Sequence, residues 1–404
     1  MRIAHVSFEY PPDTADGGIA TYVHQVSHML RDRGHDVEVF CASPTRTVSE
    51  VFEGVMVHRV QAGREDFRTK VVAVFGEQHA QQAFDIMESP EYGADGYDIK
   101  RAYPALPLVV KLHTPSFLLY DLTTYYQVTP LLVKLRYLVG GLLRGQLRQP
   151  HWQWKRKSQD MEYQLCRLAD QIHTPSVSLG QLVARRWDIA KSKIHHVPYP
   201  FIPNQEFLAV PLGTDCQTFA YIGRLEVRKG IVALVEAARL IFQAVPAARF
   251  IIIGRSQQSH IPGLDMRAYI EQQLREYRDR LDFREVRPQE IPAVLAQTDV
   301  CVYPSLWENF PNVCLEAMSA GRAIVGSEQG GMKDMLTSPQ AGLLVPPTNA
   351  AAIAEAVITL LNNPPLRRKL GETARQKVLT SYTSDVIGPL VEAKYAEAIR
   401  SRRG

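Results

Sequence analysis

The chain has 404 residues, which is too long for one ordinary hydrophobic core and suits two domains of roughly 200 residues each. Its composition, 46% hydrophobic and 22% charged, is that of a globular protein, and a formal net charge of +4 is too small at this length to indicate nucleic-acid binding. The sequence contains no uninterrupted run of about 18 apolar residues, so no membrane-spanning helix is predicted.

The N-terminal sequence and the cysteines indicate a cytoplasmic protein. The first ten residues, MRIAHVSFEY, predict a β-strand rather than a signal peptide because they lack a long apolar core. The cysteines show neither close pairing nor metal-ligand spacing, so we expect reduced, buried thiols: Cys41, Cys166, Cys216, Cys301 and Cys314.

Strand-like apolar runs alternate with helical patterns along the whole chain, which predicts parallel βαβ units and an α/β fold in two similar halves. The first half has predicted strands at residues 3–8, 36–40, 55–60, 84–89 and 108–113. The second half has predicted strands at residues 219–223, 249–254, 281–285, 300–304 and 323–327.

A proline-rich segment without periodicity, Val197–Pro211, is the predicted linker between the halves. We therefore expect a first domain over residues 1–200 and a second over residues 208–383. A final helical segment, residues 384–404, is expected to pack back on the first domain.

Two features of the first half are candidates for ligand contact. Gly17 and Gly18 follow the first strand and permit close backbone approach to a ligand, although DGGIATYV is not a GxGxxG dinucleotide fingerprint. His113 ends the strand at residues 108–113, where its ring could hydrogen-bond a reacting sugar or act as a structural residue.

The second half opens with a basic loop between a strand and a helix. In FAYIGRLEVRKG, Arg224, Arg228 and Lys229 precede a helix that begins at Ile231. Cations ahead of a helix N-terminus favour a diphosphate, while the alternative is a solvated basic turn.

Two carboxylates eight positions apart follow the strand at residues 300–304. Glu308 lies in the loop after this strand, and Glu316 lies in the second turn of a helix predicted over Asn312–Ala320. Parallel sheets bind ligands at the carboxyl ends of their strands, and carboxylates accept hydrogen bonds from sugar hydroxyls. The pattern predicts a hydroxyl-rich ligand, although Glu316 could instead be a helix acid favoured by the dipole.

The segment Thr129–Lys157 combines many leucines with basic residues and two tryptophans. Its leucines cover one broad arc of a helical wheel, with Lys134, Arg144 and Arg148 opposite. Such a helix suits an anionic membrane interface, and the alternative is a core-facing helix with a solvated basic face.

No metal site is predicted, because Asp-x-Asp, HExxH and paired-cysteine spacings are absent from the sequence. If a nucleotide diphosphate binds, Arg224 and Lys229 must neutralise it in place of a divalent ion.

Taken together, DGGIATYV, HTPSF, TPS, GRLEVRKG and ENFPNVCLEAMSAG resemble, in this order, the retaining glycosyltransferases of family 4. The resemblance covers nearly the whole chain. It implies the GT-B architecture, in which two Rossmann-like, doubly wound α/β domains face each other across a cleft.

The resemblance implies roles for individual residues. Arg224 and Lys229 would bind the donor diphosphate and stabilise the leaving group, Glu308 would contact the transferred sugar, and His113 would lie near that sugar. The donor-binding set would be Gly17, Gly18, Arg224, Lys229, Glu308, Phe310, Pro311, Asn312 and Glu316, with Glu316 on the ribose hydroxyls.

Two positions depart from the family pattern. Asp334 stands where the family often has a glutamate, and Arg255-Ser256 replaces a second glycine, so the resemblance does not extend to recognition of the base.

The sequence thus predicts a metal-independent enzyme without a cofactor that moves a hexose from a nucleotide-diphosphate sugar to a hydroxyl. The acceptor would be a glycan, a lipid-linked or a small molecule, as in polysaccharide biosynthesis. The alternatives are a nucleotide-sugar epimerase, a phosphorylase, or a non-catalytic donor-binding subunit. The expected location is cytoplasmic, with peripheral binding to the inner membrane face if residues 129–157 bind lipid.

Overall fold

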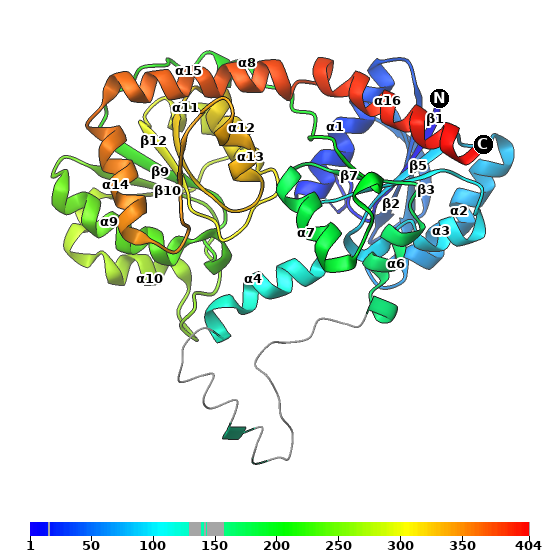
Figure 1. The fold of residues 1–404 in the computed structure, drawn as a ribbon, viewed down its shortest axis with the longest axis horizontal. Coiled ribbons are helices and arrows are strands. Elements are labelled where there is room, and N and C mark those ends of the chain that lie inside the picture. The colour runs from blue at the N-terminus through cyan, green and yellow to red at the C-terminus, as the bar shows by residue number, and fades with distance from the viewer. Residues whose placement is uncertain (15–16, 129–138, 141–142, 144–156, 404) are drawn as a thin grey trace. The chain divides into compact units, whose positions relative to one another are not determined.

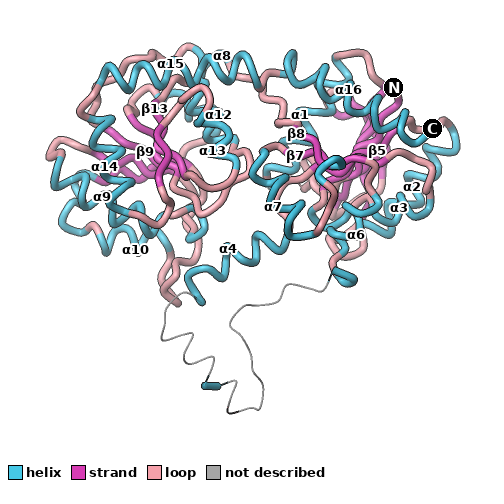
Figure 2. Tube along the Cα trace, in the orientation of Figure 1, coloured by secondary structure: helices cyan, strands magenta, loops and turns pink. Residues whose placement is uncertain are grey.

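A computed structural model describes residues 1–14, 17–128, 139–140, 143 and 157–403 (Figure 1). Its elements are short strands and helices that alternate along the chain, and the strands form the centre of each half of the molecule (Figure 2). The prediction of an α/β fold with two similar halves is confirmed.

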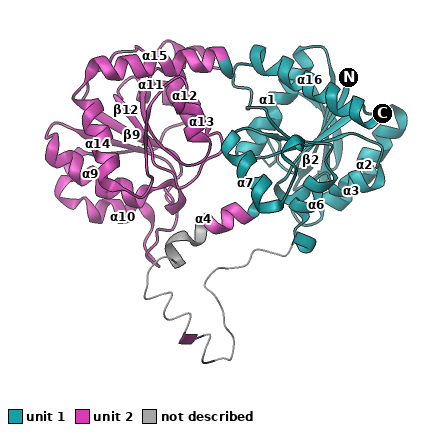
Figure 3. Cartoon of the chain, in the orientation of Figure 1, with its two compact units in different colours: residues 1–116, 155–202, 381–404 teal, residues 117–154, 203–380 magenta. Residues whose placement is uncertain are grey.

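The chain divides into two compact units (Figure 3). Unit 1 comprises residues 1–116, 155–202 and 381–404, and unit 2 comprises residues 117–154 and 203–380.

In the described part of unit 1, eight strands form one sheet in the order β3-β4-β2-β1-β5-β6-β7-β8. Its strands are β1 (Arg2–Val6), β2 (Asp36–Ser43), β3 (Val48–Phe52), β4 (Val55–Gln61), β5 (Ile86–Pro90), β6 (Leu108–Lys111), β7 (Gln171–Thr174) and β8 (Ile194–His196). Only β3 pairs antiparallel among these strands. The central strands β1, β5 and β6 are buried along their whole length, as expected for a sheet covered on both faces.

The strands that the sequence pattern missed in unit 1 lie toward the edges of the sheet. The edge strand β3 alternates between half-buried and exposed residues, and β7 and β8 are short and rich in polar residues. Apolar runs identify central strands, and these three lack such runs.

The helices of unit 1 are α1 (Gly18–Asp32), α2 (Phe67–Gln81), α3 (Tyr97–Ala102), α6 (Met161–Leu168), α7 (Val177–Trp187) and α16 (Ser384–Arg403), with α4 (Ser116–Val128) beginning at its boundary. The C-terminal helix α16 packs on unit 1 through polar contacts to the end of α1 and to β5. Glu392 pairs with Arg33 at 2.8 Å, and the Tyr395 hydroxyl donates to the buried Glu88 carboxylate at 2.8 Å.

In the described part of unit 2, six parallel strands form a sheet in the order β11-β10-β9-β12-β13-β14. They are β9 (Thr218–Ile222), β10 (Arg249–Ile253), β11 (Leu281–Arg284), β12 (Val300–Tyr303), β13 (Ala323–Ser327) and β14 (Leu343–Val345). The helices are α8 (Gln205–Leu208), α9 (Ile231–Ala244), α10 (Met266–Gln273), α11 (Ile291–Leu295), α12 (Asn312–Ser319), α13 (Gly331–Thr337), α14 (Ala350–Leu361) and α15 (Pro364–Ser381).

The neighbouring strands β9 and β12 are separated in sequence by two further strands, so the order of the chain reverses between them. In open α/β sheets, ligands bind at the carboxyl ends of strands at such a switch point. The fold of unit 2 therefore indicates that the loops after β9 and β12 are the place to expect a ligand.

The prediction that the cysteines are buried is confirmed for four of them and wrong for one. Cys41, Cys166, Cys301 and Cys314 are buried free thiols, but Cys216 is exposed, because it precedes β9 in a surface loop rather than lying within a buried element. In the described chain, no helix is long and apolar enough to cross a membrane.

Candidate active site

The loops after β9 and β12 touch each other at a glycine. Gly230 precedes α9 with φ +75°, a conformation that side chains other than glycine rarely adopt. A Cβ atom at this position would lie 1.8 Å from the carbonyl oxygen of Pro304, which follows β12. The absence of a side chain thus permits the two loops to meet directly beside Lys229.

Backbone hydrogen bonds join three loops at this edge of the sheet. The Leu306 amide donates to the Arg228 carbonyl at 2.9 Å, which links the loop after β12 to the loop after β9. The Gly331 amide donates to the Glu308 carbonyl at 2.7 Å, which links the loop after β13 to the loop after β12. The backbone around Lys229 and Glu308 is therefore held in place before any ligand binds.

Lys229 and Glu308 form an ion pair across these loops. Both side chains are mostly buried, with exposed fractions of 16% and 13%. Burial by itself would raise the pKa of Glu308, but the charges of Lys229 and Arg228 and the hydrogen bond from Lys229 hold this pKa below its ordinary value. The site therefore contains an ionised carboxylate directly beside an ammonium group.

The two arginines of the basic loop share a second carboxylate. Arg228 contacts Glu226 at 2.8 Å and Arg224 contacts it at 3.5 Å. The Arg224 side chain is 59% exposed, whereas that of Arg228 is 13% exposed. Arg224 can therefore move toward an anion more easily than Arg228 can.

Glu316 lies in the second turn of α12 and differs from Glu308 in having no compensating charge. Among the residues that the structure describes, none forms an ion pair with the Glu316 carboxylate, and burial raises its pKa to about 7. Of the residues that begin this helix, Phe310 is buried, while Pro311 and Asn312 are half-buried.

A cavity of about 520 Å³ lies within unit 2 at the carboxyl ends of β10 and β11. Its lining includes Arg255, Ser256, Arg267, Phe283 and Arg287. The Arg267 guanidinium lies 4.8 Å from the centre of the Phe283 ring, so the lining combines cations with an aromatic face.

Volume does not distinguish this cavity from others. A cavity of about 570 Å³ lies between β14 and α14, and one of about 600 Å³ lies around Lys100 in unit 1. We assign significance to the cavity beside β10 because it adjoins the loop after β9, where Gly254 packs against the backbone of Gly223.

His113 lies just beyond β6 in unit 1 and is buried. The Glu91 carboxylate accepts the His113 backbone N–H, and the Tyr199 hydroxyl lies 2.6 Å from Nδ1. Burial, together with the charge of Lys111, holds the pKa of His113 well below 6.5, so the ring is neutral.

The Tyr199 hydroxyl contacts two groups near His113. Its oxygen lies 3.1 Å from the Leu112 carbonyl oxygen and 2.6 Å from His113 Nδ1. His113 Nε2 is buried and has no partner among the described residues. Such an atom fits a hydroxyl group of a ligand.

Gly17 and Gly18 begin α1 in unit 1, and both are exposed. A Cβ atom at Gly18 would meet nothing within 4 Å, so the space beside this backbone is open. The first turn of α1 contains no acidic residue, and the Glu9 carboxylate lies 3.4 Å from the position that a Cβ atom at Gly17 would take.

Two family models match the chain in succession. One, described as a glycosyl transferase 4-like domain, matches residues 17–200, and the other, glycosyl transferases group 1, matches residues 206–377. The chain belongs to the glycosyltransferases of family 4. It is therefore a transferase enzyme, as the sequence predicts.

Relatives of this glycosyltransferase match over its full length. A glycogen synthase of Mycobacterium tuberculosis is 26% identical over 428 residues, which cover 100% of this chain and 96% of that protein. The solved structure of a sucrose-phosphate synthase from Thermosynechococcus elongatus matches with a TM-score of 0.73 at 22% identity, over 99% of this chain and 100% of that chain. HepE from Anabaena, in complex with UDP, matches with a TM-score of 0.68 at 16% identity, over 98% of this chain and 100% of that chain. The prediction of the GT-B fold class is confirmed.

The structure brings some of the predicted site residues of this glycosyltransferase together. Lys229, Glu308 and the start of α12 share one edge of the unit 2 sheet, with Arg224 on the adjoining loop. His113, Gly17 and Gly18 belong to unit 1.

Sequence reasoning missed several residues of the glycosyltransferase that surround the predicted ones. Glu226 was not singled out, although it occurs within the GRLEVRKG motif, and Tyr199 gives no local signal because it contacts His113 from 86 residues away. The arginines beside β11 could have been found as side chains following a predicted strand. The proposed membrane segment, residues 129–157, lies almost entirely outside the described residues.

Proposed function

We propose that this glycosyltransferase moves a hexose from a nucleotide-diphosphate sugar to an acceptor hydroxyl, with retention of anomeric configuration and without a metal ion. The observation that carries the proposal is the Lys229–Glu308 ion pair, held on hydrogen-bonded loops at the sheet edge where α/β domains bind ligands.

The ion pair suits a leaving diphosphate next to a sugar. Lys229 precedes the N-terminus of α9, so its ammonium and the helix amides favour the same anion. Arg224 adds a second, exposed cation. These groups stabilise the charge that develops on the diphosphate as the bond to the sugar breaks.

Glu308 and Glu316 orient the donor and do not act as the acid and base of the reaction. Glu308 is ionised and lies beside Lys229, where it accepts hydrogen bonds from sugar hydroxyls. Glu316 offers a second acceptor for the ribose hydroxyls. The cavity lined by Arg267 and Phe283 has the stacking surface and the polar groups that a nucleobase requires.

Retention follows from attack on the face that the diphosphate leaves. The bond between the sugar C1 and the phosphate oxygen breaks, and C1 forms a bond to the acceptor oxygen on the same face. The acceptor proton passes to the departing phosphate oxygen. This route needs no protein nucleophile, and it is supported by the family resemblance.

The acceptor is a hydroxyl of a glycan, a lipid-linked or a small molecule. Relatives of similar overall length include a glycogen synthase and a sucrose-phosphate synthase, so the family provides no single acceptor class. Since HepE is seen with UDP, UDP-glucose is the first donor to test.

The test is a screen of UDP-, ADP- and GDP-hexoses with candidate acceptors in the presence of EDTA. We expect acceptor-dependent release of the nucleoside diphosphate and a product whose anomeric configuration, read by NMR, equals that of the donor. An inverted product refutes retention, and activity restored only by added Mg²⁺ or Mn²⁺ refutes the metal-free site.

An epimerase acting on the donor alone is the second candidate, and the same screen distinguishes it. Release of nucleotide or rearrangement of the sugar at equal rates with and without acceptors would favour the epimerase.

Membrane association through residues 129–157 is proposed on the amphipathic pattern alone. Flotation of the full-length protein with vesicles of phosphatidylglycerol and phosphatidylcholine at low salt should carry it to the top of the gradient. Protein that stays at the bottom refutes the proposal.

A further inference from the structure

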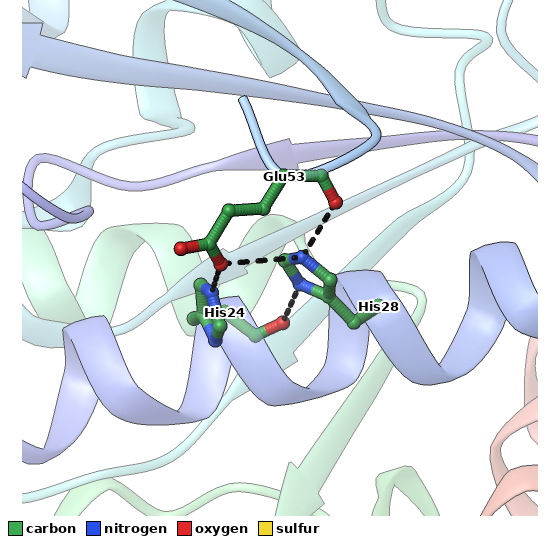
Figure 4. A group of neighbouring side chains, drawn as sticks. All are labelled: His24, His28 and Glu53. Atoms are coloured by element: carbon green, nitrogen blue, oxygen red, sulfur yellow. Dashed lines mark hydrogen bonds and ion pairs between the residues drawn. The ribbon is translucent and has the colours of Figure 1, made fainter. Parts of the chain in front are cut away.

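Two histidines and a glutamate converge on the surface of unit 1 (Figure 4). His24 and His28 project from consecutive turns of α1, and Glu53 lies in the turn between β3 and β4. One ligand atom from each residue lies within 4.8 Å of the others. The cluster thus joins a helix to a hairpin.

The distances within the cluster are close to those around a small cation. His24 Nε2 lies 2.7 Å from Glu53 Oε2, and His28 Nε2 lies 3.7 Å from the same oxygen. A tetrahedral Zn²⁺ with bonds of about 2.0–2.1 Å keeps its ligand atoms roughly 3.3 Å apart. The two histidine–carboxylate distances lie on either side of this separation, and all three ligand atoms lie within 4.8 Å of one another.

The backbone of the hairpin presents Glu53 to the helix. Glu53 has φ +49°, in the left-handed region, and Gly54 continues the turn with φ +82°. This turn directs both the Glu53 carboxylate and its carbonyl oxygen toward His28. A two-residue hairpin turn of type I′ requires positive φ at both of its residues, so the turn itself accounts for the left-handed conformation of Glu53.

His28 contacts two carbonyl oxygens, and a neutral imidazole can donate to only one of them. Its Nδ1 lies 2.8 Å from the His24 carbonyl, and its Nε2 lies 3.1 Å from the Glu53 carbonyl. A neutral imidazole has only one N–H, so one nitrogen would face a carbonyl oxygen with its lone pair. If Nδ1–H donates to the His24 carbonyl, the Nε2 lone pair points at the Glu53 oxygens. Either a second proton on the ring or a metal ion removes this conflict.

We propose that His24 Nε2, His28 Nε2 and the Glu53 carboxylate bind one Zn²⁺ ion. Two imidazoles and one carboxylate are a ligand set that Zn²⁺ prefers and Mg²⁺ does not. The backbone hydrogen bond of His28 Nδ1 supplies the outer contact that orients a metal-binding imidazole.

Partial exposure permits the ion to enter. The side chains of His24, His28 and Glu53 are 31%, 14% and 56% exposed. Water or the Glu53 carbonyl completes the coordination. Such an ion ties α1 to the β3–β4 hairpin and stabilises the folded form of unit 1.

One neighbouring cation opposes binding. Arg31, one turn further along α1, donates to the Glu53 carbonyl. Its charge repels a bound Zn²⁺, so Arg31→Gln is expected to increase the affinity for Zn²⁺.

The test is isothermal titration of ZnCl₂ and of MgCl₂ into the full-length protein after dialysis against a chelator. We expect one equivalent of Zn²⁺ to bind and no heat from Mg²⁺. His28→Ala and Glu53→Gln should each weaken Zn²⁺ binding by at least about tenfold. The matched control is His260→Ala, which removes an exposed histidine of unit 2.

Co²⁺ substitution gives a second readout, because tetrahedral Co²⁺ absorbs visible light strongly. The wild-type protein should develop this absorption and His28→Ala should not. Failure of the wild-type protein to bind Zn²⁺, or equal affinity in His28→Ala, Glu53→Gln and His260→Ala, overturns the proposal. The titrations use no donor or acceptor, so their outcome is independent of the proposed transferase reaction.

Discussion

The loops of unit 2 hold charged groups in close pairs, whereas the end of β6 in unit 1 holds a neutral histidine. Lys229 and Glu308 are both mostly buried, and the charge of each offsets the free-energy cost of burying the charge of the other. His113 is also buried, but its partners are a hydroxyl and a backbone-bound carboxylate, and the charge of Lys111 disfavours its protonation.

Because of this difference, the two units have different roles in the proposed reaction. Unit 2 can receive the charge of a leaving diphosphate, because it has cations on preorganised loops. Unit 1 offers His113 Nε2 for a hydrogen bond without adding charge. Four predictions test this difference between the units, and the largest expected effect comes first.

Lys229→Ala should lower kcat by about 10³-fold, because it removes the ammonium that stabilises the leaving diphosphate. The matched control is Lys369→Ala, an exposed lysine of α15, which should retain wild-type activity. The measurement is the initial rate of nucleotide release at saturating donor and acceptor.

Loss of Lys229 also leaves Glu308 without its ion-pair partner, so a fold defect must be separated from a catalytic one. The double variant Lys229→Ala/Glu308→Gln removes the unpaired charge and should recover thermal stability without recovering activity. Near-normal turnover in Lys229→Ala would show that the diphosphate binds elsewhere.

Gly230→Ala should lower the free energy of unfolding by about 3 kcal/mol, through left-handed backbone strain and a clash with the Pro304 carbonyl. The control is Gly213→Ala, whose Cβ would meet nothing within 4 Å and which should change stability by less than about 0.5 kcal/mol. Urea unfolding measures both. Equal stability of the two variants would show that the loops after β9 and β12 do not meet as described.

Glu316→Gln should make the protein more stable at pH 8 and leave it little changed at pH 4. Burial raises the pKa of Glu316 to about 7 from 4.5, so the folded protein retains a proton that the unfolded chain releases between these pH values. The stability contributed by this group is present below pH 4.5 and is lost as the pH rises through 7.

The expected loss is about 2 kcal/mol at pH 8, since the carboxylate is only half-buried. Thermal unfolding of the wild-type and Glu316→Gln proteins between pH 4 and pH 8 measures it. A constant stability difference across this range would contradict the effect of burial on Glu316.

His113→Ala should lower kcat by about tenfold, the value of one hydrogen bond, and should leave the pH dependence between pH 6 and pH 8 unchanged. The pKa of His113 is held well below 6.5, so the neutral ring does not titrate in this range. Tyr199→Phe, which removes the hydroxyl beside Nδ1, should lower kcat by less. If the pH profile of the wild-type kcat contains a titration step that His113→Ala abolishes, the ring gains and loses a proton in this range. The contrast between a charged site in unit 2 and a neutral histidine in unit 1 would then be wrong.

The sequence by itself determined which segments form the central strands and where the charged loops lie along the chain. Apolar runs marked β1, β9, β10 and β12 because buried parallel strands are apolar along their length. Glycine and charge patterns marked the loops around Lys229 and Glu308, since loop conformation depends on neighbouring residues.

Only the tertiary structure decided which distant side chains meet. Lys229 and Glu308 are 79 residues apart, and they pair because β9 and β12 are neighbours in the sheet. Glu53 reaches His28 because a left-handed turn returns the β3–β4 hairpin to α1. Local sequence patterns indicate which residues are buried and where turns occur. Strand order brings remote residues together, and the packing of the whole domain decides that order.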